Sequence, residues 1–235
     1  MTNRRVVKKI LETINNQVEE LKGTSEGKNR IMSLVLKLIM GYCGVGQKDY
    51  MILAGYGLKC IRPTTDIDVG VKKGAFDKIK KKKIGEMSIA KIGQQSRIDQ
   101  RIVIKIPEID KDAEIEIFEH QSHGFPLGRF SITNLSKKNS FTKDEYGNQY
   151  YNVQTLADFY SCVKKRNDEY YWGELDIKKE RFEKNLKHLT LLYEHLQKCK
   201  NGDLSSEELE VCDCLGHKND LKYLKNRIDY LKSLL

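Results

Sequence analysis

The fold is decided by three short stretches, which read MILAGYG at residues 51–57, DIDV at 66–69 and EIEIF at 114–118. Residues two apart in a strand point to the same side of a sheet, so Asp66 and Asp68 should present two carboxylates on one face. Two like charges at that spacing repel each other unless a cation lies between them. A divalent ion that prefers oxygen ligands, above all magnesium completed by phosphate oxygens, removes this repulsion.

The flanking stretches supply the other parts of a phosphate-handling site. Glu114 and Glu116 share one face of a later strand, and either is a candidate for the third acid of a two-metal site. Gly55 and Gly57 form a turn whose backbone N–H groups are open to phosphate oxygens. Gly55 precedes Asp66 by eleven residues. A glycine turn, an acid pair and a later acid in this order are far more specific than any one of them.

The periodicity of the remaining chain predicts an α+β protein. Strand-like alternation falls in the middle of the chain, and helical spacing falls on both sides of it. We expect strands over 50–54, 66–71, 101–106 and 114–118, and helices over about 3–22, 75–83, 154–165, 175–198 and 218–235. A further helix should follow the break at 23–25 and end near Gly41 and Gly44, and another should begin at Ser205 or Ser206. Residues 1–150 should form a small mixed sheet flanked by helices, and residues 151–235 a C-terminal helical bundle.

The composition favours a globular protein with an anionic partner. Of the 235 residues, 39% are hydrophobic and 32% charged, which excludes a disordered or fibrous chain. The formal charge of +9 favours RNA or a triphosphate as the partner, although a Lys-, Ile- and Asn-rich composition also arises from codon bias. No apolar run is long enough for a membrane span and no signal peptide opens the sequence, so we expect a cytoplasmic protein.

The cysteines are expected to be reduced, and most of them buried. Cys43, Cys60 and Cys162 stand singly in apolar stretches, as small core residues do. A zinc site is the alternative for the later group of Cys199, Cys212, Cys214 and His217. Their spacing lacks the usual two-residue gap between paired cysteines, which favours structural roles for them.

At residues 48–120 the sequence resembles the polymerase-beta-type nucleotidyltransferase superfamily, and within it the AbiEii/MenT toxin-like branch. The shared pattern is an apolar strand, a glycine turn, an acid-apolar-acid pair and a later lone acid. The resemblance implies that Asp66, Asp68 and Glu116 are catalytic and bind two magnesium ions, with Glu114 as the alternative third acid. It also implies nucleotide contacts, which would come from Gly55, Tyr56, Gly57, Arg62, Thr64, Lys164, Lys165 and Asp168.

The resemblance implies an enzyme that moves a nucleotidyl group from a nucleoside triphosphate to an acceptor. For the toxin-like branch the acceptor is RNA such as the 3′ end of tRNA, and an antitoxin protein is a possible partner. One alternative is a small-molecule, antibiotic-type enzyme with an acceptor pocket lined by aromatic residues such as Tyr150, Tyr151, Tyr170, Tyr171 and Trp172. Another is an inactive nucleotide- or RNA-binding domain of the same fold, which Ala54 favours because the family's turn usually has glycine there.

Overall fold

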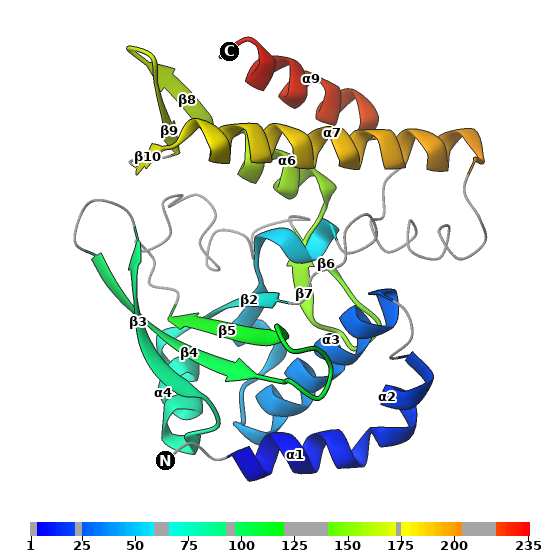
Figure 1. The fold of residues 1–235 in the computed structure, drawn as a ribbon, viewed down its shortest axis with the longest axis vertical. Coiled ribbons are helices and arrows are strands. Elements are labelled where there is room, and N and C mark those ends of the chain that lie inside the picture. Colours follow the sequence, from blue (N-terminus) through cyan, green and yellow to red (C-terminus); the bar gives the residue numbers. More distant parts are fainter. Residues whose placement is uncertain are drawn as a thin grey trace.

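The computed structural model describes residues 4–21, 25–58, 66–92, 97–119, 141–172, 175–203 and 220–235. It confirms the expected α+β class, with a seven-stranded mixed sheet, a three-stranded sheet and helices around both. In Figure 1 the large sheet and the N-terminal helices form one end of the molecule, and the C-terminal helices with the small sheet form the other.

The N-terminal region contains three helices, which are α1 (Arg4–Thr13), α2 (Asn15–Leu21) and α3 (Ser25–Tyr42). The single helix expected over 3–22 is therefore divided next to Ile14. The hydroxyl of Thr13 donates to the carbonyl oxygen of Lys9 at 2.8 Å, and such a bond to the preceding turn often bends a helix. The apolar stripe still faces inward, because Val7, Leu11, Ile14 and Val18 are all buried.

The large sheet has the strand order β3-β4-β5-β2-β1-β7-β6. Its strands are β1 (Tyr50–Ile52), β2 (Asp66–Val71), β3 (Glu86–Ile92), β4 (Arg97–Lys105), β5 (Glu114–Glu119), β6 (Phe141–Lys143) and β7 (Gln149–Tyr151). The pairing of β2 with β5 is parallel, whereas β1 with β2 and β4 with β5 pair antiparallel. The short helix η1 (Gln47–Asp49) precedes β1, and the short helix η2 (Ala54–Leu58) follows it.

One face of this sheet is covered by helices. Ile67 and Val69 of β2 and Ile115 and Ile117 of β5 are buried in the same cluster as the apolar faces of α1, α3 and α4 (Lys73–Lys82). Alternation within the strands sends the residues between them to the other face. The acidic residues of β2 and β5 therefore lie on the face opposite these helices.

The C-terminal part contains the expected helices and also a small sheet that the periodicity does not predict. Helix α6 (Val153–Ser161) ends earlier than expected, and a three-stranded sheet follows, formed by β8 (Val163–Arg166), β9 (Glu169–Trp172) and β10 (Leu175–Ile177). Asn167 and Asp168 link β8 to β9 with φ angles of 50° and 65°, which is a two-residue hairpin turn of the kind that matches strand twist. The long helix α7 (Lys179–Asn201) and α9 (Leu221–Lys232) then pack together as expected.

The two ends of the molecule share a hydrophobic core. Met51, Leu53 and Leu58 come from β1, the residue after it and η2, yet they are buried in one cluster with side chains of α6, α7 and α9. The segment that leads from β1 into the glycine turn is thus enclosed between both parts of the chain. Among the described residues, no helix has the length and apolarity needed to cross a membrane.

Candidate functional site

Four carboxylates form an array on the open face of the sheet. The parallel register of β2 and β5 sets Asp66 beside Glu114 and Asp68 beside Glu116. Neighbouring strands lie about 4.8 Å apart and successive same-face residues about 7 Å apart, so the four acids occupy a compact rectangle. The acid pair expected from the sequence is joined by both candidate third acids.

The electrostatics of this array are dominated by Asp68. Burial, and then the negative charges of Asp66 and Glu116, raise the pKa of its carboxyl from 3.8 to about 7. Burial and the charge of Glu116 also raise the pKa of Glu114. The raised pKa values mean that full ionisation of the carboxyls on this face is unfavourable. A bound cation would lower that energetic cost.

One basic side chain enters the array from the neighbouring strand. Arg101 of β4 donates from Nη1 to Oε1 of Glu116 at 2.5 Å, and from Nε to the hydroxyl of Ser88 at 2.7 Å. Ser88 lies directly opposite Arg101 in the pairing of β3 with β4. No sequence motif singled out Arg101, because only the strand order brings it next to Glu116.

The glycine turn begins immediately beside the acid array. The backbone N–H of Leu53 donates to the carbonyl oxygen of Asp68 at 2.7 Å, and η2 starts at the next residue. Of the three turn residues expected to contact nucleotide, Gly55 is the one with open space around it, since a Cβ there would meet nothing within 4 Å. The side chain of Tyr56 is buried, and Gly57 packs against Leu156.

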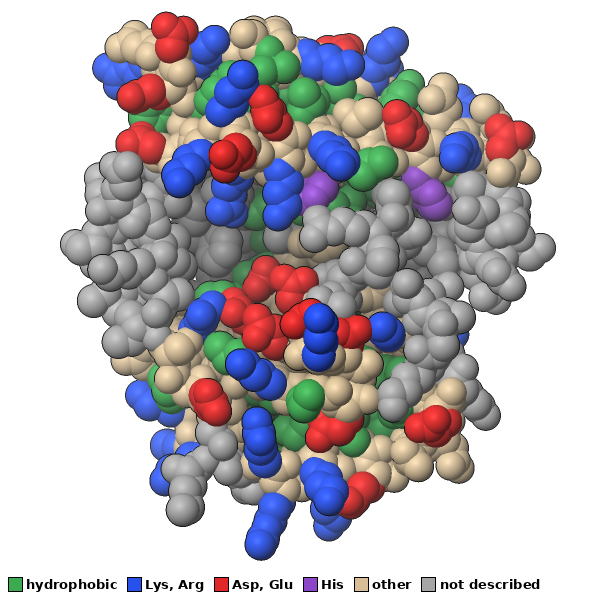
Figure 2. Space-filling model, viewed as in Figure 1, with side chains coloured by type: hydrophobic (Ala, Val, Ile, Leu, Met, Phe, Trp, Pro, Cys, Tyr) green, Lys and Arg blue, Asp and Glu red, His purple; other side chains and the backbone are tan. Residues whose placement is uncertain are grey.

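Figure 2 shows where this face lies in the whole molecule. Asp and Glu side chains gather at a hollow between the sheet and the C-terminal helices, and Lys and Arg side chains lie around it. Asp66 is exposed and Asp68, Glu114 and Glu116 are half-buried, so the acidic array is reachable from solvent. It is also bordered by positive charge, which attracts polyanions.

The donor set of the array fits a hard divalent cation. All four side chains offer carboxylate oxygens, the ligands that magnesium prefers, and the pKa values of Asp68 and Glu114 are raised by burial and then by the neighbouring negative charges. As they stand in the described part of the chain, no three His, Cys, Asp or Glu side chains converge enough to enclose an ion. An ion would therefore be held by Asp66 and Asp68 with Glu114 or Glu116 after side-chain rotation.

Several expected nucleotide contacts are not brought to this array. Lys164, Lys165 and Asp168 lie in the β8–β9 hairpin, which Figure 1 shows projecting from the far end of the molecule, near the C-terminus. Nζ of Lys165 instead lies 3.8 Å from Oδ1 of Asp168 and 5.9 Å from the ring centroid of Tyr170. Arg62 and Thr64 lie outside the described residues, as do Cys60 and the group of Cys212, Cys214 and His217.

Of the aromatic residues considered for an acceptor pocket, Tyr150, Tyr151 and Tyr170 are core residues, whereas Tyr171 is half-buried and its hydroxyl donates to Glu169. Tyr150 and Tyr151 are buried, and the ring of Tyr170 stacks on Phe182 with 4.3 Å between centroids. Their positions do not favour a small-molecule acceptor pocket built from these side chains. Cys43 and Cys162 are buried as expected, and Cys199 is buried too.

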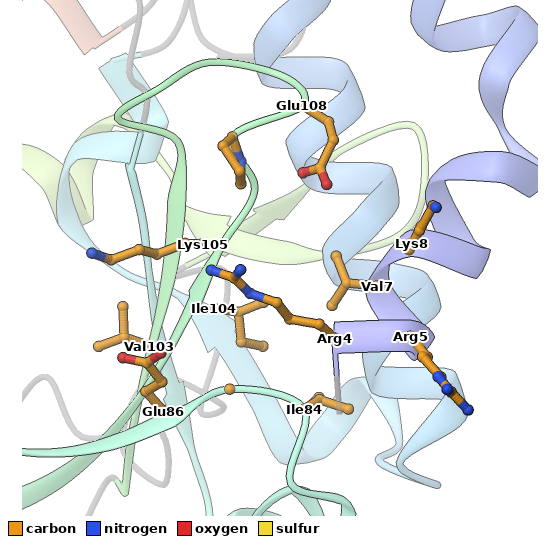
Figure 3. A pocket seen from close by; sticks show the side chains of 12 residues that line it. Arg4, Arg5, Val7, Lys8, Ile84, Glu86, Val103, Ile104, Lys105 and Glu108 are labelled. Carbon is orange, nitrogen blue, oxygen red and sulfur yellow. The ribbon is translucent and has the colours of Figure 1, made fainter. Parts of the chain in front are cut away.

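A cavity of about 220 Å³ lies elsewhere, where the start of α1 meets the ends of β3 and β4. In Figure 3 Arg4 extends across its opening toward β4, whereas Arg5 points away. Lys105, Val103 and Glu108 also contribute to its lining, but none of the four array acids does. This cavity is therefore separate from the carboxylate array.

No protein-family model matches the chain, and neither does any curated protein or solved structure. The resemblance at residues 48–120 thus rests on the motif and on the placement of its residues.

Proposed function

We propose that this protein is a magnesium-dependent nucleotidyltransferase that moves a nucleotidyl group from a nucleoside triphosphate to RNA. The observation that carries the proposal is the joint placement of the acid pair, the later acids and the turn. The register of β2 with β5 and the bond from Leu53 to Asp68 bring these separate stretches of sequence to one place. None of these stretches alone would be specific for a nucleotidyltransferase.

The chain's own residues would act mainly by positioning. Asp66 and Asp68 would hold the ions, with a third carboxylate from β5, and the open backbone at Gly55 would let phosphate oxygens approach. Bound magnesium supplies charge neutralisation for the leaving pyrophosphate and lowers the pKa of the attacking hydroxyl. The buried setting of Asp68 strengthens its interaction with a cation, because the local dielectric is lower than that of water.

RNA is the preferred acceptor because of charge. The chain has 42 basic and 33 acidic residues, and the lysines of α4 from Lys80 to Lys82, with Lys83 after them, are exposed. Because α4 covers the face of the sheet opposite the array, these lysines would attract a polyanion to the molecule as a whole rather than contact it at the array. A toxin-like role and a partner antitoxin belong to the same proposal.

The test is transfer of label from each nucleoside triphosphate, with magnesium, in the presence and absence of total tRNA. Transfer to RNA by the wild-type protein is expected, and Asp66→Asn and Asp68→Asn should each lower it at least about a hundredfold. The matched control is Asp112→Asn, because the Asp112 side chain is 71% exposed in a loop and lies outside the array. Unchanged transfer in both array variants would disprove the proposal. Transfer of label to a small molecule instead of RNA would keep the activity and replace RNA as the acceptor.

A further inference from the structure

The ion pair between Arg101 and Glu116 lies inside the acidic array. The side chains are 32% and 15% exposed, so the pair is shielded from water more than a surface ion pair is. The second bond, from Nε to Ser88, fixes the guanidinium from the other side. Charge-assisted bonds with fixed geometry are among the strongest that side chains make.

This ion pair divides the four acids into two kinds. Oε1 of Glu116 is occupied by the guanidinium, whereas the structure gives Glu114 no ion pair among the described residues. Glu114 is the strand neighbour of Asp66, and Glu116 that of Asp68. A cation that binds Asp66 and Asp68 therefore meets a ready third carboxylate in Glu114. It reaches Glu116 only by sharing or displacing Arg101.

We infer that Arg101 is a positioning residue that limits the nucleotide-free array to one divalent ion, by holding Glu116 out of the metal shell. The inference rests on the proposed metal-binding function of the array. A second ion lacks a free carboxylate and meets the positive charge of the guanidinium. It is therefore expected to bind only when a triphosphate brings further oxygen ligands with it.

The test is titration with Mn²⁺ followed by electron paramagnetic resonance, without nucleotide, at pH 8. The wild-type protein should bind one ion, and Arg101→Met should bind two, with the second ion at least about tenfold tighter than in the wild type. The matched control is Lys105→Met, because Lys105 is on the same face of β4 and lies opposite Glu114 rather than Glu116. This control removes the same charge and should still bind one ion.

Two outcomes would overturn the inference. Equal stoichiometry and affinity in the wild type and Arg101→Met would show that the ion pair does not limit binding. An equal gain in Lys105→Met would show that general charge is responsible. Ser88→Ala provides a second variant if Arg101→Met does not fold, because it frees the guanidinium without removing it and should tighten the second ion by a smaller factor.

The same titration separates this inference from the proposed function. If Mn²⁺ binds as expected and no nucleotide is transferred, the inference holds and the proposed activity fails. If transfer occurs but the wild type already binds two ions tightly, the activity holds and the inference fails. If neither the wild type nor Arg101→Met binds Mn²⁺, both fail.

Discussion

The hydroxyl of Tyr56 donates a hydrogen bond to the carboxylate of Asp144, 3.2 Å away, and so ties the glycine turn to the loop between β6 and β7. Asp144 is buried, and it also accepts bonds from the Ser33 hydroxyl, from the Asn148 side chain and from the backbone N–H groups of Tyr146 and Asn148. Tyr50, at the start of β1, donates to Asn148 at 2.5 Å. The segment from β1 to η2 is thus anchored at both ends to one buried carboxylate and its neighbour.

Replacing Asp144 should destabilise the protein strongly. Asp144→Ala leaves several buried donors without their acceptor, and we expect the free energy of unfolding in urea to fall by about 3 kcal/mol. Tyr56→Phe is the matched comparison, because it removes one bond from the network and should lower the same quantity by about 1 kcal/mol. Equal losses in the two variants would contradict the central role of Asp144.

The buried glycine of the turn should not tolerate a side chain. A Cβ at residue 57 would lie 2.4 Å from Cδ1 of Leu156 and 3.2 Å from the carbonyl oxygen of Tyr151. Because Leu156 is buried, Gly57→Ala should lower the free energy of unfolding by about 2 kcal/mol. In a protein that already carries Leu156→Ala, Gly57→Ala should lower the free energy of unfolding less than it does in the wild type. Strictly additive losses in this double-mutant cycle would argue against the contact.

The open glycine of the same turn should behave differently. A Cβ at residue 55 meets nothing within 4 Å, so Gly55→Ala should leave the thermal midpoint nearly unchanged. If phosphate oxygens approach the backbone there, the methyl group obstructs them, and KM for the nucleoside triphosphate should rise roughly tenfold. A normal KM in a stable Gly55→Ala protein would remove this part of the turn from the nucleotide site.

The raised pKa of Asp68 predicts how stability depends on pH without metal. The folded protein keeps a proton on Asp68 up to about pH 7, whereas the unfolded chain releases it near the ordinary value of 3.8. The free energy of unfolding should therefore fall as pH rises from about 4 to about 7 and then level off, by at most about 4 kcal/mol from this group.

Asp68→Asn is the control for that dependence, since it should remove most of the slope. Magnesium added at pH 8 should stabilise the wild type more than the variant, because the ion binds the ionised carboxylate. Urea unfolding in EDTA at several pH values, with and without magnesium, measures both effects. A wild type and a variant with the same pH dependence would show that Asp68 titrates normally.

The parts of the fold that sequence could predict are those with a strict local pattern. Strand β2 begins and ends where the alternation from Asp66 to Val71 predicts, and β5 is predicted nearly as well. The sequence does not predict strand β3, because Glu86–Ile92 follows a lysine-rich helix and mixes polar and apolar residues without clear alternation. The helix expected over 154–165 overlaps the start of the β8–β9 hairpin, whose turn uses Asn167 and Asp168 at positive φ instead of the glycine that usually marks such a turn in a sequence.

In the candidate site, too, only the features that depend on local spacing could be predicted. Asp66 and Asp68 share a face because of their spacing, which any strand provides. That Glu114 and Glu116 lie next to them depends on β5 pairing with β2 rather than with another strand, which no local pattern determines. Arg101 and Asp144 were not predicted for the same reason, because their partners are distant in sequence and meet only through the order of the strands and the packing of α3.

The shared core around Met51, Leu53 and Leu58 has a consequence for the order of synthesis. A nascent chain that has emerged only as far as β7 contains all four array acids and the glycine turn, but the apolar side of β1 and η2 still lacks the helices that cover it. Such a fragment already contains the partners that bind the turn, Asp68 and Asp144, but Met51, Leu53 and Leu58 are covered only when α6, α7 and α9 have been made. A ribosome-bound fragment of this length would therefore carry the acids and the turn with an apolar surface beside them that the C-terminal helices later bury.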